Sequence, residues 1–126
     1  MPATTAAQRW FEPVAATIAE ARRFAVAATP PQIDHAETVA LLVSELAANA
    51  VIHARTRYRV SVRVDGSTLT IEVHDGDPHL AVKQSIAADS TGGGRGLALV
   101  DALATRWGTD PDDDGKTTWF EIRYDT

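Results

Sequence analysis

Cysteine is absent from this chain of 126 residues, and so is any long apolar run. Without cysteine there is no disulfide framework, and nothing points to an oxidising compartment. The first ten residues, MPATTAAQRW, lack the apolar core of a signal peptide. No stretch approaches the roughly 20 apolar residues that are needed to cross a bilayer. The sequence therefore predicts a cytoplasmic protein with no membrane-embedded segment.

Basic residues are scarce as well, with 12 Lys and Arg against 17 Asp and Glu and a net charge of -5. Proteins that bind nucleic acid ordinarily gather Lys and Arg against the phosphates, so no nucleic-acid partner is predicted. An anionic ligand would have to be bound locally. Backbone N–H groups at the start of a helix can bind an anion without any net positive charge.

The apolar content of 44% is enough for one core, so residues 1–126 are predicted to form a single domain with a loose N-terminus over 1–10. Apolar residues recur at helical spacing in three segments. Helices are therefore expected over Val14 to Ala28, Gln32 to Ala54, and Leu97 to about Arg106.

Strand patterns lie between and after these helices. Tyr58 to Val64 alternates apolar and polar residues, Asp65-Gly66 supplies a hairpin turn, and Leu69 to Val73 returns. A last strand is expected over Thr117 to Ile122, after a turn at Asp110 to Gly115. This order predicts an α/β (α+β) two-layer sandwich, with a mostly antiparallel sheet and helices on one face.

The first candidate site is a polar stripe on the second helix. Glu45, Asn49 and His53 lie four residues apart, so each is about 40° further round the helix than the last. On spacing alone, the simpler interpretation is that these side chains bond the neighbouring turn. The functional interpretation makes Asn49 an oxygen ligand for Mg²⁺ and Glu45 a general base.

The second candidate is Asp75, which follows an apolar strand. A carboxylate at a strand end can accept a hydrogen bond from an exocyclic amine such as that of adenine. Asp75-Gly76 and Asp77-Pro78 are also ordinary turn pairs, and alone they favour a turn.

The third candidate is a glycine-rich run that leads into the third helix. Glycines let backbone N–H groups approach a phosphate closely, and the helix start adds partial positive charge. A flexible loop followed by a helix entry explains the same residues. The run lacks the Gly-Lys-Ser/Thr of a Walker loop. Its residues are Gly92, Gly93, Gly94, Arg95, Gly96 and Leu97.

An acidic segment near the C-terminus has the spacing of a calcium-binding EF-hand loop. The matching residues are Asp110, Asp112, Asp114, Gly115 and Glu121. An EF-hand needs an exit helix, but the residues around Glu121 are rich in β-formers. We interpret the segment as an acidic hairpin turn.

Taken together, these sites resemble the ATP-binding superfamily of gyrase, histidine kinases and MutL, the Bergerat fold. Glu45 to His53 resembles the N box, and Asp75 resembles the adenine-binding aspartate of the first glycine box. Gly94 to Leu97 resembles the second glycine box, and Gly115 to Thr117 the last box, whose threonine helps hold that aspartate. The chain is most similar to the single-domain anti-sigma factor and serine kinase group, over nearly its whole length.

The resemblance implies ATP and Mg²⁺ as cofactors and phosphorylation of a serine on an anti-sigma-factor antagonist. A sigma factor would be the second partner, and homodimerisation is left open. Glu45 would be the catalytic base, Asn49 the Mg²⁺ ligand and Asp75 the adenine reader, with residues 79–93 as the ATP lid. The remaining cofactor contacts would be His53, Gly76, Gly92, Gly93, Gly94, Arg95, Gly96, Leu97 and Thr117.

Two departures from the superfamily pattern leave other functions open. Asp77 and His79 stand where the first glycine box has glycines, and the lid is short. There is no room for phosphoacceptor helices, so histidine autophosphorylation is not expected. The alternatives are a nucleotide-gated partner-binding module without phosphotransfer and a structural interaction domain without nucleotide.

Overall fold

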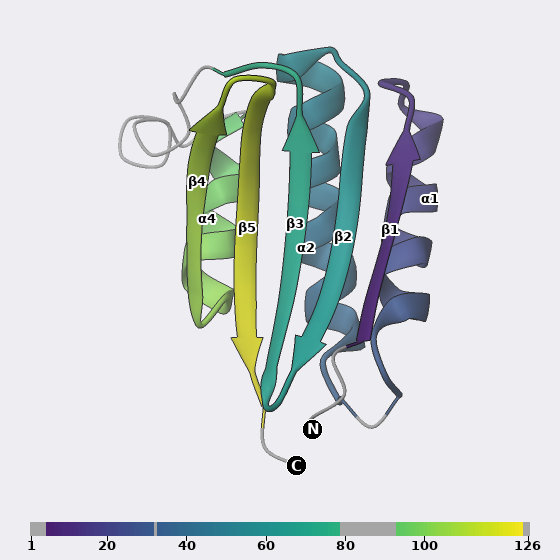
Figure 1. Cartoon of the computed structure of the whole chain (residues 1–126), viewed down its shortest axis with the longest axis vertical. Coiled ribbons are helices and arrows are strands. Elements are labelled where there is room, and N and C mark those ends of the chain that lie inside the picture. The colour runs from purple at the N-terminus through teal and green to yellow at the C-terminus, as the bar shows by residue number, and fades with distance from the viewer. Residues whose placement is uncertain (1–4, 32, 79–92, 125–126) are drawn as a thin grey trace.

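The computed structural model describes residues 5–31, 33–78 and 93–124. In chain order its elements are β1 (Thr5–Phe11), α1 (Ala16–Ala28), α2 (Ala36–Asn49), a π-helical turn (Ala50–Ala54), β2 (Tyr58–Asp65), β3 (Thr68–Asp75), α4 (Gly93–Leu103), β4 (Arg106–Asp112) and β5 (Gly115–Arg123). The strands form one antiparallel sheet in the order β1-β2-β3-β5-β4. The helices cover one face and leave the other face open (Figure 1). The predicted two-layer α/β sandwich is confirmed.

The core lies between the sheet and the helices. Alternate residues of β2 and β3, such as Val60 and Ile71, are fully buried, as are Leu42 and Val43 of α2. Alternate residues of β5 are buried in the same way, and Phe120 is one of them. Because successive strand residues point to opposite faces, the odd residues of β3 and the even residues of β2 and β5 form the covered face.

Small residues let α1 approach α2 closely. Ala21 and Ala25 of α1 and Ala47 of α2 have no solvent exposure. A buried hydrogen bond of 2.7 Å joins the Thr17 and Tyr58 hydroxyls and ties α1 to β2. Close packing and one buried hydrogen bond therefore hold α1 in place.

Two edge strands correct the sequence prediction. Residues 1–10 were expected to be loose, but Thr5–Phe11 pairs with residues 58–64 of β2. Its alanine-rich sequence gives no clear alternation, so the pairing depends on the tertiary context. The segment expected to end the third helix and form a turn contains β4, with Pro111 inside it. Proline lacks a backbone N–H and is tolerated on an edge strand, which is where β4 lies.

The third helix is also displaced from its expected bounds. Helix α4 begins at Gly93 and ends at Leu103, so the glycine run forms its first turn. The predicted acidic hairpin is present, since β4 and β5 pair with Asp112 opposite Gly115. Glu121 pairs with Arg106 at the far end of that hairpin, away from Asp112 and Asp114.

The second helix runs through the predicted span as α2 and the π-helical turn. The whole stretch, Ala36–Ala54, has the length and composition of a membrane span, with a mean hydropathy of 1.2. Several of its apolar side chains, including Leu42 and Leu46, are buried in the core, whereas Leu41 and Ile52 are exposed. Core packing therefore accounts for part of its hydropathy.

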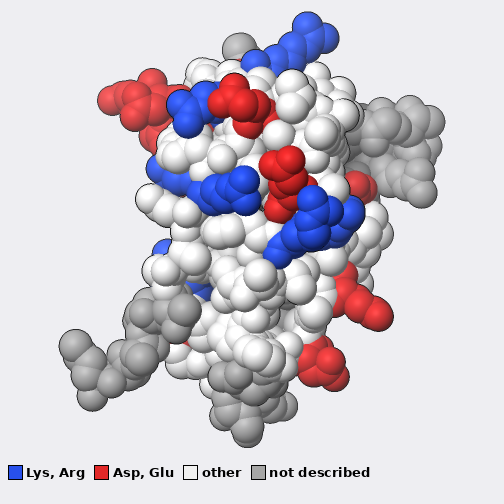
Figure 2. Space-filling model, turned by 90° about the vertical axis from the view of Figure 1, so that its right-hand side faces the viewer, with Lys and Arg blue, Asp and Glu red and all other residues white. Residues whose placement is uncertain are grey.

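The side of the molecule that carries β1 and α1 mixes charges of both signs. Figure 2 shows basic and acidic groups next to one another on this face. Arg57 pairs with Glu12 at 3.3 Å and Arg9 with Glu20 at 3.8 Å. This face therefore offers no broad basic surface of the kind that a polyanion needs.

Candidate functional site

Three of the predicted sites meet at one end of the sheet. Figure 1 shows the end of α2, the end of β3, the start of β5 and the start of α4 at this same end. Helix α4 packs against α2, and Asp75 is paired with Lys116 in the register of β3 and β5. The candidate ATP site therefore lies on the covered side of the sheet.

Asp75 is the most constrained side chain of this site. Its side chain is 8% exposed, and that of Lys116 is 11% exposed. One oxygen, Oδ1, accepts the backbone N–H of Asp77 at 2.8 Å and the Lys116 ammonium at 3.1 Å. Within the part of the chain that the structure describes, Oδ2 has no hydrogen-bond partner, which leaves it free to accept a bond from a ligand.

Lys116 is a residue that the sequence reasoning missed as part of the site. Its ammonium also donates to the backbone carbonyl of Asp77 at 3.0 Å, so it joins the end of β3 to the turn that follows. The sequence did contain an indication. Lys116 is an even-numbered residue of β5, like Phe120 and Ile122, and these residues face the core. A buried lysine needs an anionic partner, and the register supplies Asp75.

Two glycines shape the backbone around Asp75. A Cβ on Gly115, whose φ is +146°, would lie 1.9 Å from the Asp75 carbonyl oxygen. Gly76 donates its N–H to the Thr56 hydroxyl at 2.8 Å, and a Cβ there would touch that side chain. A close approach of the Asp75 backbone therefore accounts for Gly115 on β5, and a tight contact with the Thr56 side chain accounts for Gly76, which follows β3.

The polar stripe on α2 is brought to the same end of the sheet in part. Glu45 and Asn49 are half-buried and one helical turn apart, so they share a face. Neither side chain has a hydrogen bond or ion pair with any residue that the structure describes. His53 is exposed and lies in the π-helical turn, whose wider winding breaks the regular four-residue stripe.

The glycine run supplies backbone donors. Gly93, Gly94, Arg95 and Gly96 form the first turn of α4, where backbone N–H groups have no partner within the helix. Leu97 is buried at 2% exposure, so its side chain belongs to the core. Gly92 and residues 79–92 of the predicted 79–93 lid lie outside the described residues, and the last lid residue, Gly93, begins α4.

Thr117 lies on the other face of the sheet. Its hydroxyl contacts Nδ1 of His74 at 3.0 Å on the open side. Thr118 is the threonine that shares the covered face with Asp75, and it is buried beside Val73. The structure thus places Thr118, rather than Thr117, on the side of the candidate site.

The residues present fit a Mg-ATP ligand by chemistry. Among the described residues, one Asp75 carboxylate oxygen and the Asn49 amide have no hydrogen-bond partner, and α4 offers backbone donors at its first turn. A carboxylate oxygen can accept an amine proton, helix N–H groups bind phosphate, and Mg²⁺ takes oxygen ligands. Mg²⁺ would be held by Asn49 together with ligand oxygens.

Comparison with known proteins identifies a family for the chain. A search of curated proteins gave no match to the chain. The family model of the histidine kinase-like ATPase domain matches residues 11–122, which includes every described element except most of β1. The family supports ATP as the ligand. The chain belongs to the histidine kinase-like ATPase domain family.

Proposed function

We propose that this chain is an anti-sigma factor serine kinase, which binds Mg-ATP, phosphorylates an anti-sigma-factor antagonist and sequesters a sigma factor. Asp75 carries most of the proposal. A buried carboxylate with one oxygen occupied by Lys116 and Asp77 and the other left open is suited to accept one amine hydrogen bond. The resemblance of Glu45 and Asn49 to the N box supports the kinase assignment.

Each residue has a distinct role in the proposed site. When bound, Mg-ATP supplies the phosphoryl group and the cation that neutralises its charge. Asp75 Oδ2 accepts the adenine amine, and the first turn of α4 donates N–H groups to the phosphates. Asn49 presents its carbonyl oxygen to Mg²⁺, and Glu45 takes the proton of the substrate serine hydroxyl. Thr118 takes the place that was expected for Thr117 beside the aspartate.

Nucleotide binding is tested first, through Asp75. Asp75→Asn replaces an acceptor with a donor that faces the amine. The loss of one charge-assisted hydrogen bond is worth about 1.5 to 3 kcal/mol of binding free energy. Calorimetry with Mg-ATP should show this loss, whereas Glu37→Gln, an exposed change at the start of α2, should bind like the wild type. Equal affinities for Asp75→Asn and wild type would remove the adenine assignment.

Phosphotransfer is tested separately, through Glu45. Labelled ATP and Mg²⁺ are incubated with candidate antagonists encoded near this protein. Glu45→Gln keeps the size of the side chain but cannot take the serine proton, so transfer should fall by about 100-fold, at the low end of general-base effects, while ATP affinity survives. Asn49→Asp should instead alter the Mg²⁺ dependence. A wild type that binds ATP and a partner but transfers no phosphate would be a nucleotide-gated binder.

A further inference from the structure

A shallow groove of about 370 Å³ lies on the open face of the sheet. It is centred on the start of β3, whereas Asp75 is the last residue of that strand. Thr68 and Asp75 are about 23 Å apart at roughly 3.3 Å per residue, and the groove is on the face that the helices do not cover. It is therefore separate from the candidate ATP site.

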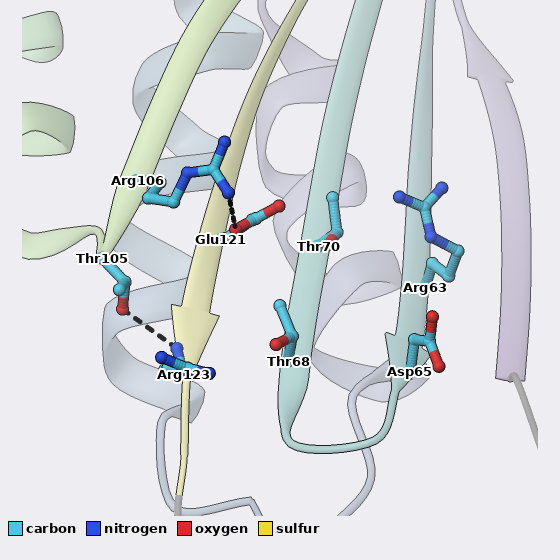
Figure 3. A pocket seen from close by; sticks show the side chains of 8 residues that line it. All are labelled: Arg63, Asp65, Thr68, Thr70, Thr105, Arg106, Glu121 and Arg123. Carbon is cyan, nitrogen blue, oxygen red and sulfur yellow. Dashed lines mark hydrogen bonds and ion pairs between the residues drawn. The ribbon is translucent and has the colours of Figure 1, made fainter. Parts of the chain in front are cut away.

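The register of the sheet sets polar side chains of the groove in two rows (Figure 3). The first row runs across four strands as Arg63, Thr70, Glu121 and Arg106. The second row contains Asp65, Thr68 and Arg123. Antiparallel pairing places both rows on the same face, so these side chains project into one hollow.

Only some of the charged side chains in the groove form ion pairs with described residues. Arg106 reaches Glu121 at 3.7 Å, and Figure 3 shows these two side chains together. Within the described part of the chain, the guanidinium groups of Arg63 and Arg123 have no ion-pair partner. They come from strands two places apart, whose backbones are about 10 Å apart. Two long side chains can therefore converge on one small anion between them.

Thr70 lies on the floor of the groove. The residue is only 7% exposed, but its hydroxyl has no hydrogen bond to any described residue and remains accessible to solvent. It can therefore donate to or accept from a ligand in the groove. Thr70 lies directly between Arg63 and Glu121 in the register, so its side chain is next to that of Arg63 on the open face.

We propose that this groove binds a single phosphate group, held by the guanidinium groups of Arg63 and Arg123 and by the hydroxyl of Thr70. A guanidinium matches the geometry of phosphate oxygens and can donate two parallel hydrogen bonds. Three arginines and two carboxylates line the hollow, so its positive charge suits one phosphate group and not the many phosphates of a nucleic-acid strand. A monophosphate is therefore preferred over a nucleic-acid strand. The phosphate can come from a small molecule or from a phosphorylated side chain of a protein.

Backbone amide chemical shifts of the full chain test this site. The chain is titrated at constant ionic strength with inorganic phosphate, and then with a short peptide carrying one phosphoserine and its unphosphorylated form. Saturable shifts should appear at Thr70, Glu121 and Arg123. Saturation by phosphate identifies a small-anion site, and saturation by the phosphopeptide alone identifies a phosphorylated protein segment. Shifts confined to Asp75 and the first turn of α4, or no saturation with either ligand, would overturn the proposal.

Matched variants then decide which residues bind. The double variant Arg63→Gln and Arg123→Gln should weaken binding by about tenfold or more, because charge-assisted hydrogen bonds are lost. Thr70→Val keeps the shape of the side chain and removes only the hydroxyl, so it should weaken binding by a smaller factor. Arg23→Gln, an exposed change on α1, is the control and should bind as the wild type does. Equal affinity of the double variant and the control would exclude the groove.

Discussion

The two faces of β5 treat charge in opposite ways. On the covered face, Lys116 is buried and its ammonium is held by Asp75 and the carbonyl of Asp77. On the open face, Arg123 is exposed and its guanidinium has no ion-pair partner within the described residues. A buried charge must be paired inside the fold, whereas an exposed one is solvated and stays free for a ligand. The same strand thus carries one charge that is fixed inside the fold and one that is exposed to solvent.

The largest effect is expected from Gly115→Ala, at the start of β5 next to Lys116. The new Cβ would lie 1.9 Å from the Asp75 carbonyl, and a φ of +146° is strained for alanine. We expect a loss of about 4 kcal/mol or more in the free energy of unfolding, measured by urea denaturation. Gly66→Ala is the matched control, because its φ is +63° and nothing lies within 4 Å. Equal losses for the two variants would mean that backbone strain alone, without the contact, explains Gly115.

Lys116→Met should have the next largest effect. It leaves the buried carboxylate of Asp75 without its cation, which typically costs about 3 to 5 kcal/mol. Adding Asp75→Leu should restore much of the stability, since an apolar pair of similar volume is often neutral. Denaturant unfolding of the two single variants and the double variant measures this coupling. Simple addition of the two single losses would show that the pair does not act as a unit.

The sequence predicted the centre of the fold better than its edges. The hairpin of β2 and β3 was recognisable because Tyr58, Val60 and Val62 alternate with polar residues. Strand β4 was not, because glycine, proline and aspartate disfavour strands and only an edge position tolerates them. Edge strands are stabilised by their neighbour, which local sequence does not encode.

The candidate site was predictable by residue type but not by geometry. Asp75 was identified because a carboxylate ends an apolar strand. The face on which Thr117 lies depends on the register of β5, and a shift of one residue exchanges it with Thr118. Lys116 became part of the site only when that register placed it opposite Asp75.

An intermediate effect on stability is expected at Tyr58, whose hydroxyl joins β2 to α1. Burial raises its pKa above the ordinary value of 10.0, the hydrogen bond between the Tyr58 and Thr17 hydroxyls opposes this, and nearby Glu20 adds to it. The neutral phenol is therefore favoured in the folded state. Its contribution to stability is complete below pH 10.0 and is lost as the pH rises through the folded pKa.

Tyr58→Phe tests this contribution. The variant loses the 2.7 Å bond to Thr17 and should be about 0.5 to 1.5 kcal/mol less stable near neutral pH. It should also lose part of the fall in stability above pH 10.0, measured by denaturant unfolding at a series of alkaline pH values. An identical alkaline fall in both proteins would exclude Tyr58 as its source. Tyr124→Phe is a matched control, because that hydroxyl bonds Gly66 at the exposed β2–β3 turn.

The smallest effect is expected from the exposed ion pair of Arg57 and Glu12, which completes the contrast with Lys116. Their 3.3 Å contact is as short as many buried pairs, but the side chains are 59% and 69% exposed. Arg57 also lies over the Trp10 ring at 5.0 Å. Water and salt screen such a pair, and fixing two long side chains has an entropic cost, so Arg57→Gln should change stability by about 0.5 kcal/mol or less. Denaturation at low and high salt measures it. A loss approaching that of Lys116→Met would mean that burial is not what separates the two pairs.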